Sequence, residues 1–177
     1  MTVAANLSTS RMLDDVAARY GATVVRTPVG EANVAEAMRR GQSIIGGEGN
    51  GGVIWPRVTY VRDRVSGIAL TLRMLAAESR PLSAFVADIP AYAIVKDKVD
   101  IQPGMTDGLA DRLRQTFSDA RVDEQDGVRL DWSDRWAHVR PSNTEPILRI
   151  IAEAPDEKDA RALVAHVRDA LGLSDSH

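Results

Sequence analysis

The pattern of apolar and polar residues differs between the two halves of this chain of 177 residues. In the first half, short apolar or β-branched runs at Thr2–Leu7, Thr23–Arg26 and Ser43–Ile45 are separated by stretches in which apolar residues recur every three or four positions. That spacing predicts amphipathic helices over about residues 11–20 and 32–40. Strands that alternate with helices of about ten residues are typical of βαβ units, so we expect a mainly parallel sheet.

Capping and turn residues agree with these elements. Ser8, Thr9 and Ser10 can cap the first helix, and Gly41 is expected to end the second. A further strand is expected at Val53–Trp55, directly after a run of glycines.

A longer helix is predicted over about residues 63–78, with Asp63 as its N-cap. Its apolar residues recur on one side and are expected to form its buried face: Val65, Ile68, Ala69, Leu72 and Ala76. Pro81 and Pro90 then enclose a short helical segment, and the pattern changes beyond it. We place a domain boundary there.

In the second half, strands follow one another with short turns. Strands are expected at 92–99, 128–132, 135–139 and 147–152, and helices near 109–117 and 160–171. Such an order favours an antiparallel sheet with helices on one face. We therefore predict a three-layer α/β domain with βαβ connections over residues 1–90 and a small α+β domain over residues 91–177.

Composition and charge exclude several classes of function. The absence of cysteine excludes disulfides, thiolate catalysis and cysteine-ligated zinc, and the three histidines lack the spacing of metal ligands. The net charge of −3 disfavours nucleic-acid or anionic membrane partners, which need a basic face. No apolar run approaches about 18 residues, and the N-terminus lacks the pattern of a signal peptide. We expect a cytoplasmic protein with no nucleic-acid or membrane partner.

Five glycines stand among residues 46–52, directly after a predicted strand. Glycine lets a backbone approach a ligand closely, and ligands of open α/β sheets lie at the carboxyl ends of the strands. The segment is neither a Walker loop nor a dinucleotide fingerprint, because no Lys-Ser/Thr follows and no helix begins there. Its carboxylate, Glu48, and its amide, Asn50, suit recognition of sugar hydroxyls. The equally supported alternative is a glycine-rich hairpin with a solvated Glu48.

A second polar segment, Arg140-Pro141-Ser142-Asn143-Thr144-Glu145-Pro146, lies between two predicted strands. A guanidinium can bind a phosphate in bidentate fashion, and hydroxyl and loop N–H groups can contact its remaining oxygens. Glu145 would repel such a dianion unless it points away. From composition alone, an ordinary polar turn is slightly favoured.

Other polar residues carry weaker hypotheses. His138 is a single histidine in a strand and is better explained by packing than by catalysis. Asp131 and Asp134 suggest a metal site, but two carboxylates in a hairpin are more often solvated. Trp132 and Trp136 are better explained as cover for the sheet than as a stacking platform.

The two polar segments together resemble those of a known family. Residues 47–52, Gly-Glu-Gly-Asn-Gly-Gly, resemble the sugar-binding loop of the α-D-phosphohexomutases, often G-E-M-S-G-H, and residues 140–146 are similar to their R-P-S-G/N-T-E-P phosphate loop. Residues 6–10 and 27–31 also resemble that family, in the same order. The resemblance extends from about residue 3 to residue 170, and the string R-P-S-N-T-E-P is specific.

The resemblance implies the third and fourth of the family's four domains, whose active site lies in the cleft between domains. It implies that Glu48 and Asn50 bind sugar hydroxyls. It implies that a second set binds the phosphate of a hexose phosphate: Arg140, Ser142, Asn143 and Thr144. Two positions depart from the pattern, since Gly52 replaces a histidine of some members and Asn50 stands where others have serine.

The family's chemistry uses a phosphoserine in a T-x-S-H-N-P-like loop and a Mg²⁺ ion held by a D-x-D-x-D-R loop, and neither string occurs here. We therefore expect the substrate-binding C-terminal portion of an isomerase that moves phosphate between C1 and C6 of a hexose. Its Mg²⁺ ligands and N-terminal domains lie outside this chain, which by itself is expected to be inactive. Two alternatives are a non-catalytic phosphosugar-binding module and a structural fragment with idle loops.

Overall fold

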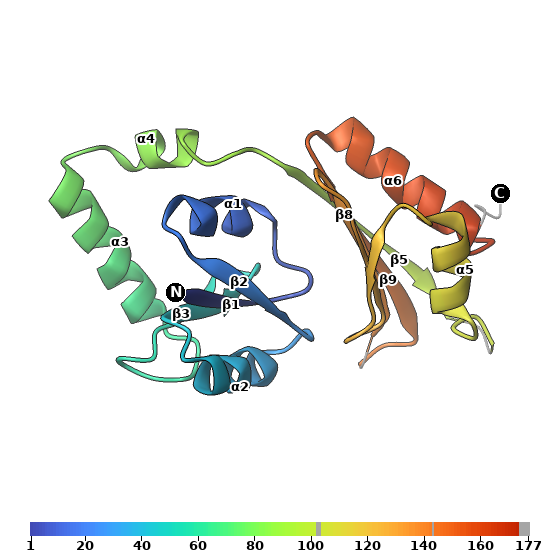
Figure 1. Ribbon diagram of the computed structural model, residues 1–177, viewed down its shortest axis with the longest axis horizontal. Helices are drawn as coiled ribbons and strands as arrows, with labels where there is room; N and C mark the ends of the chain where they lie inside the picture. Colours follow the sequence, from blue (N-terminus) through green and yellow to red (C-terminus); the bar gives the residue numbers. More distant parts are fainter. Residues whose placement is uncertain (102–103, 143, 174–177) are drawn as a thin grey trace. The chain divides into compact units, whose positions relative to one another are not determined.

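The computed structural model describes residues 1–101, 104–142 and 144–173. The chain divides into two compact units, Met1–Pro90 and Ala91–His177, each with a sheet of its own (Figure 1). The fold class predicted from the sequence is confirmed: a mixed α/β unit is followed by an antiparallel sheet with helices.

The elements of the first unit alternate as predicted. They are β1 (Thr2–Asn6), α1 (Met12–Arg19), β2 (Thr23–Thr27), α2 (Glu31–Gly41), β3 (Ile45–Glu48), β4 (Gly52–Ile54), α3 (Arg64–Glu78) and α4 (Leu82–Ala87). The sheet order is β2-β1-β3-β4, in which β1 is parallel to β2 and β3, and β4 is antiparallel to β3.

Helices α1 and α2 lie on opposite faces of this sheet (Figure 1). Neighbouring residues of a strand point to opposite faces, and on β1 Val3 packs with Ala17 of α1 while Ala4 packs with Val34 and Met38 of α2. The three layers expected for the first unit follow from this alternation.

The helix ends differ in part from the prediction. Asp63 is confirmed as the N-cap of α3, because its carboxylate accepts hydrogen bonds from the backbone N–H groups of Val65 and Ser66. Gly41 is the last helical residue of α2, and the C-cap is the next residue, Gln42, in the left-handed conformation with φ 49°. The helix thus continues one residue further, and a non-glycine residue takes the left-handed position.

The predicted buried face of α3 is wrong. The side chains of Val65, Ile68 and Leu72 are 71%, 60% and 60% exposed. Helix α3 meets the sheet at β4 through its first turns, where Ser66 is buried and Gly67 lies close to Val53. An apolar stripe on a helix indicates burial somewhere, and the described residues do not supply the cover.

The second unit is a five-stranded antiparallel sheet in the order β5-β9-β8-β7-β6. Its elements are β5 (Ala93–Asp100), α5 (Leu109–Thr116), β6 (Arg121–Asp123), β7 (Val128–Asp131), β8 (Trp136–Pro141), β9 (Ile147–Ala154) and α6 (Glu157–Ala170). Helices α5 and α6 cover one face, as predicted (Figure 1). Strand β6 was not predicted, because three residues with two charges give no readable alternation.

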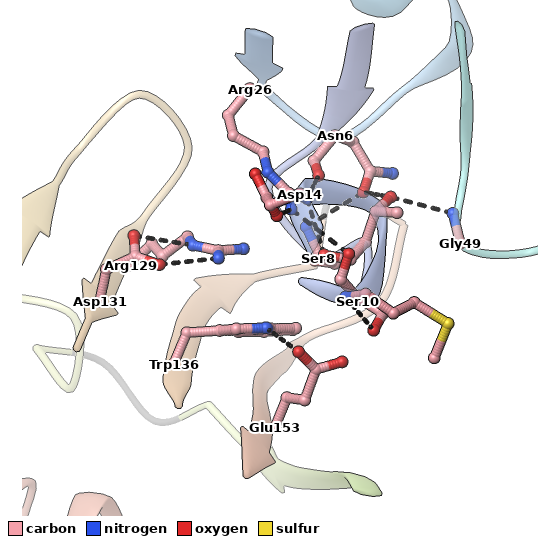
Figure 2. A network of polar contacts seen from close by, with 12 residues as sticks. Asn6, Ser8, Ser10, Asp14, Arg26, Gly49, Arg129, Asp131, Trp136 and Glu153 are labelled. Atoms are coloured by element: carbon pink, nitrogen blue, oxygen red, sulfur yellow. Dashed lines mark hydrogen bonds and ion pairs between the residues drawn. The ribbon is translucent and has the colours of Figure 1, made fainter. Parts of the chain in front are cut away.

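The other face of this sheet carries polar side chains that are nonetheless buried. Trp136 donates its indole N–H to Glu153, directly opposite on β9, at 2.8 Å (Figure 2). The guanidinium of Arg129 lies 4.3 Å from the centre of the Trp136 ring and is paired with Asp131. The prediction that Trp136 covers the sheet is confirmed. The carboxylate of Asp131 forms an ion pair with Arg129.

Within the described ranges, no helix has both the length and the apolar character needed to cross a membrane.

Candidate functional site

The candidate sugar-binding residues lie at one edge of the first sheet. Strands β1, β2 and β3 are parallel, so their carboxyl ends meet there. The segments that follow them, residues 7–10, 28–31 and 49–51, are the ones whose sequences resemble the mutase family. The fold therefore brings together three motifs that are separated in sequence by about twenty residues each.

Glu48, at the end of β3, joins these segments. Its side chain is only 8% exposed. Its Oε1 accepts hydrogen bonds from the side-chain amide of Asn6 at 2.8 Å and from the backbone N–H of Gly30 at 3.1 Å. Its Oε2 lies 3.7 Å from Nη1 of Arg62. Oε1 thus binds two protein N–H groups, whereas Oε2 faces Arg62.

Asn6 continues this network into the segment after β1. Its Oδ1 accepts hydrogen bonds from the backbone N–H of Ser8 at 3.0 Å and from the hydroxyl of Thr9 at 2.8 Å. The Thr9 hydroxyl in turn accepts the backbone N–H of Gly49 at 3.0 Å (Figure 2). The glycine-rich segment is therefore held from the side by the neighbouring strand's loop.

Arg26 of β2 fixes the segment that follows β1. Its Nη1 donates to the carbonyl oxygens of Asn6 at 3.1 Å and Thr9 at 2.7 Å, and its Nη2 forms an ion pair with Asp14 (Figure 2). No sequence pattern singled out Arg26. Its position in a β-branched strand gave no signal, because carbonyl groups from another loop are its partners.

The glycine-rich segment is a tight hairpin between β3 and β4. Gly47 pairs with Val53, and a Cβ on Gly47 would lie 2.2 Å from the carbonyl oxygen of Gly52. A Cβ on Gly52 would lie 2.0 Å from Cδ of Arg62. Packing inside the hairpin explains these two glycines. The alternative of a glycine-rich hairpin is therefore correct for the backbone, but it is wrong for Glu48, which is not solvated.

Asn50 is exposed at the tip of this hairpin and lines a pocket of about 260 Å³. The other lining residues are Glu31, Gly51, Gly52, Arg62 and Arg64. The pocket combines an amide, loop backbone and two guanidinium groups, which are groups that bind hydroxyls and anions.

Arg62 is held in this pocket by Glu31. The carboxylate of Glu31 accepts the backbone N–H of Arg62 at 2.8 Å and its Nε–H at 2.7 Å. These hydrogen bonds lower the pKa of Glu31 below its ordinary value and raise the pKa of Arg62, so both groups stay charged. No motif indicated this pair, since its members are 31 residues apart.

The candidate phosphate loop connects β8 and β9 in the second unit. Its ends are closed by backbone hydrogen bonds from Ser142 N–H to the Ile147 carbonyl and from Ile147 N–H to the Glu145 carbonyl, both 2.8 Å long. The hydroxyl groups of Ser142 and Thr144 lie 3.4 Å apart. Asn143, which the sequence places in the same set, lies outside the described residues.

The charged side chains around this loop form ion pairs. Glu145, whose charge would oppose a phosphate, is paired with Arg149 at 2.8 Å. Nε of Arg140 lies 3.0 Å from Oδ2 of Asp126, in an ion pair that lacks the alignment of a hydrogen bond. Its terminal nitrogens Nη1 and Nη2 have no hydrogen-bond partner among the residues that the structure describes. The N–H groups of that edge can bind a phosphate in bidentate fashion.

The remaining candidates have structural explanations. His138 is completely buried, its Nε2 lies 2.6 Å from the carbonyl oxygen of Asp126, and burial lowers its pKa below the ordinary value. Asp131, considered as a metal ligand, is held by Arg129 at 2.8 Å. Within the described part of the chain, no three His, Asp or Glu residues are grouped so that they could hold a metal ion.

Comparison with known families gives a match along nearly the whole chain. Residues 1–92 match "Phosphoglucomutase/phosphomannomutase, alpha/beta/alpha domain III". Residues 93–170 match "Phosphoglucomutase/phosphomannomutase, C-terminal domain".

One curated relative, the probable phosphoglucosamine mutase of Methanopyrus kandleri, is 40% identical over 165 residues. The alignment covers 91% of this chain and 36% of the relative, so the chain spans little more than a third of that protein's length.

Solved structures share the fold. A phosphoglucomutase/phosphomannomutase family protein from Burkholderia thailandensis has a TM-score of 0.80 at 22% identity, over 99% of this chain and 38% of the other. The Aspergillus fumigatus N-acetylphosphoglucosamine mutase in complex with GlcNAc-6P and magnesium has a TM-score of 0.69 at 16% identity, over 96% and 38% of the two chains. With both family domains matched in order, this chain belongs to the phosphoglucomutase/phosphomannomutase family, in which it corresponds to domain III and the C-terminal domain.

Proposed function

We propose that this chain is the substrate-binding C-terminal portion of a phosphohexomutase that moves phosphate between the C1 and C6 hydroxyls of a hexose. In this proposal residues 1–90 carry the sugar-binding groups and residues 91–177 carry the phosphate-binding groups. Glucosamine phosphate is the first substrate to test, because the relative at 40% identity is named a probable phosphoglucosamine mutase.

The observation that carries this proposal is the state of Arg140. Its side chain is 9% exposed, its Nε faces Asp126, and both terminal nitrogens lack hydrogen-bond partners among the described residues. Nε is the buried nitrogen of this guanidinium that lacks a hydrogen-bond partner, and the Nη1–Nη2 edge is open to a ligand. Ser142 and Thr144 offer hydroxyl groups in the same loop, and Asn143 is the remaining member of the proposed phosphate set.

On the sugar side, Glu48 and Asn50 are proposed to contact hydroxyl groups. A divided role for Glu48 is supported by its contacts, because Oε1 is bound by Asn6 and Gly30 while Oε2 faces Arg62. Oε2 would therefore accept a sugar hydroxyl, and the exposed amide of Asn50 would contact the ring from the pocket.

Phosphoryl transfer itself needs groups that this chain would receive from elsewhere. A metal ion must neutralise charge on the phosphoryl group, and the carboxylates of the described residues are not grouped to hold one. We propose that Mg²⁺ and the phosphorylated serine belong to N-terminal domains of the complete enzyme. The A. fumigatus mutase, whose complex contains magnesium together with GlcNAc-6P, is consistent with this proposal.

The exposed apolar face of α3 is a candidate contact surface for these N-terminal domains. Val65, Ile68 and Leu72 form an apolar stripe that is more than half exposed, and stripes of this kind mark interaction surfaces. The relative at 40% identity extends far beyond the aligned region, since only 36% of its length is covered. We propose that the N-terminal domains of the complete enzyme pack on this face.

The test has two measurements on residues 1–177. A coupled mutase assay with Mg²⁺ and a hexose 1,6-bisphosphate activator is expected to show no turnover, because the transferring groups are absent. A titration with glucosamine 6-phosphate is expected to show saturable binding, which Arg140→Ala weakens by about 1.5–3 kcal/mol, the contribution of charge-assisted hydrogen bonds.

The matched control is Arg121→Ala, which removes the same charge from a side chain that is 80% exposed in the same unit. Equal affinities for Arg140→Ala and Arg121→Ala would show that the loop is an ordinary turn. Turnover by the chain alone would place the nucleophile within these residues and refute the division of roles. Binding without any gain of activity when N-terminal domains are restored would favour the non-catalytic binding module.

A further inference from the structure

The guanidinium of Arg140 is held from a turn that no motif singled out. The turn connects β6 to β7, and it carries Asp126. Oδ2 of Asp126 lies 3.0 Å from Nε of Arg140, and the two side chains are 19% and 9% exposed. The carboxylate therefore meets the inner nitrogen of the guanidinium and leaves Nη1 and Nη2 without a hydrogen-bond partner among the described residues.

This turn is itself fixed to the strand that carries Arg140. His138 and Arg140 are two residues apart on β8 and so share one face of the sheet. Nε2 of His138 lies 2.6 Å from the carbonyl oxygen of Asp126. A carbonyl oxygen only accepts, so His138 carries a proton on Nε2 and donates it.

Gly127 brings the turn into direct contact with β8. Its φ is +72°, and a Cβ on it would lie 2.3 Å from the carbonyl oxygen of Val139 and 2.8 Å from Cα of Arg140. The neighbours are backbone atoms, which cannot move aside. Only glycine permits this approach, and the approach sets the distance from which Asp126 reaches Arg140.

We propose that Asp126 is a positioning residue for phosphate binding. By attracting the Nε side of the guanidinium, it selects one rotamer of Arg140 and presents the Nη1–Nη2 edge to two phosphate oxygens. The inference rests on the proposed function of the phosphate loop and adds to it a residue outside that loop. Because arginine loses much rotamer freedom when it binds, fixing it in advance strengthens binding.

A second effect of Asp126 has the opposite sign. Its negative charge, close to the guanidinium, repels an incoming dianion. If repulsion were its only role, removing the carboxylate would strengthen phosphate binding. If positioning prevails, removing it weakens binding. The direction of the change therefore decides between the two.

The experiment titrates the ¹⁵N-labelled chain, residues 1–177, with inorganic phosphate and separately with glucosamine 6-phosphate. The Nε–Hε signal of Arg140 is followed by NMR. Asp126→Ala is expected to weaken phosphate binding about threefold to tenfold, the effect of freeing one long side chain. Asp126→Asn is expected to fall between Asp126→Ala and the unchanged chain, because an amide oxygen still attracts Nε–H without the full charge.

The matched control is Asp123→Ala. It removes one carboxylate from the same hairpin, where Asp123 accepts hydrogen bonds from the backbone and side chain of Gln125. The general effect of charge is similar in both variants, so the difference between them reports the contact with Arg140. Loss of Asp126 should also broaden or shift the Arg140 Nε–Hε signal before any ligand is added, which a merely structural change elsewhere would not produce.

The outcomes separate this inference from the function on which it rests. If Arg140→Ala weakens phosphate binding while Asp126→Ala and Asp123→Ala bind equally, the loop binds phosphate and the positioning role is refuted. Tighter binding by Asp126→Ala would show that repulsion prevails. If the unchanged chain gives no saturable shift with either ligand, the phosphate site and the positioning role both fall.

Discussion

Glu48 is proposed to have two roles, one in the stability of the first unit and one in sugar binding, and two substitutions can separate them. Replacing Glu48 by alanine removes the acceptor that joins Asn6 of β1 to the backbone N–H of Gly30. Replacing it by glutamine keeps an oxygen at the same place and changes only the charge and the second polar atom. The two substitutions should therefore affect stability very differently.

The magnitude follows from the contacts. A hydrogen bond to a charged group contributes about 1.5–3 kcal/mol, and Oε1 of Glu48 accepts two of them at 2.8 and 3.1 Å. At the lower end of that range, Glu48→Ala should cost about 3 kcal/mol. Glu48→Gln keeps two neutral hydrogen bonds and should cost about 1 kcal/mol. The approach of Oε2 to Arg62 at 3.7 Å adds little, since Arg62 is 39% exposed.

The assay is urea unfolding followed by NMR, because two units need not unfold together. The indole signal of Trp55 reports the first unit, and those of Trp132 and Trp136 report the second. With a urea dependence of about 1–1.5 kcal/mol per molar, Glu48→Ala should lower the midpoint of the Trp55 transition by about 2–3 M. The midpoints of the second unit serve as the internal control and should not move.

Two results would refute this reasoning. If Glu48→Ala leaves the Trp55 midpoint unchanged, the network around Oε1 contributes nothing to the fold. If Glu48→Gln is as unstable as Glu48→Ala, the charge rather than the hydrogen-bonded oxygen stabilises the unit. A stable Glu48→Gln chain can then be tested for sugar-phosphate binding without a change of fold.

The second unit should lose stability in mild acid because of His138. Burial lowers the pKa of His138 below the ordinary value of about 6.5. As the pH falls, the unfolded state therefore binds the proton before the folded state does. The unfolding free energy should then fall by up to about 1.4 kcal/mol per pH unit below about pH 6.5. The loss should be smaller in His138→Gln, whose side-chain N–H can still donate to the carbonyl of Asp126, and equal slopes in both chains would contradict it. On α3, Ile68→Glu with Leu72→Glu should change the unfolding free energy of the isolated chain by no more than about 0.5 kcal/mol, since both side chains are 60% exposed. A loss of several kcal/mol in urea unfolding would show that this face is buried, as its pattern suggested.

Much of the fold could be predicted because periodicity is a local property. The periodicity of apolar residues predicted the α/β and α+β classes. The carboxylate of Asp63 caps α3, as expected. Strand β6 escaped prediction since Arg121–Asp123 is too short to show a period. The end of α2 was misplaced because glycine at a helix end is a preference, and Gln42 adopted the left-handed conformation in its place.

The candidate site was predictable in its motifs and less so in its contacts. The sequence named Glu48, Asn50, Arg140, Ser142, Asn143 and Thr144, and their roles stay predictions. It gave no role to Arg26, Arg62 or Asp126, because each acts on a partner from a distant segment. A motif shows which side chains occur together along the chain, whereas the residues that hold them come from other strands and turns.

By itself, then, the sequence determined the order of the elements, the class of each unit and the two short strings that mark the family, because these depend on neighbouring residues. Only the tertiary structure decided that Oε1 of Glu48 is occupied by Asn6 and Gly30 and that Asp126 faces Arg140 at Nε. It also decided that the apolar stripe of α3 is exposed. The physical reason is the same in all three cases. Hydrogen bonds and burial depend on the atoms that are near in space, whatever their distance in sequence. The hydrophobic pattern of a helix predicts a buried face but does not identify the part of the protein that packs on it.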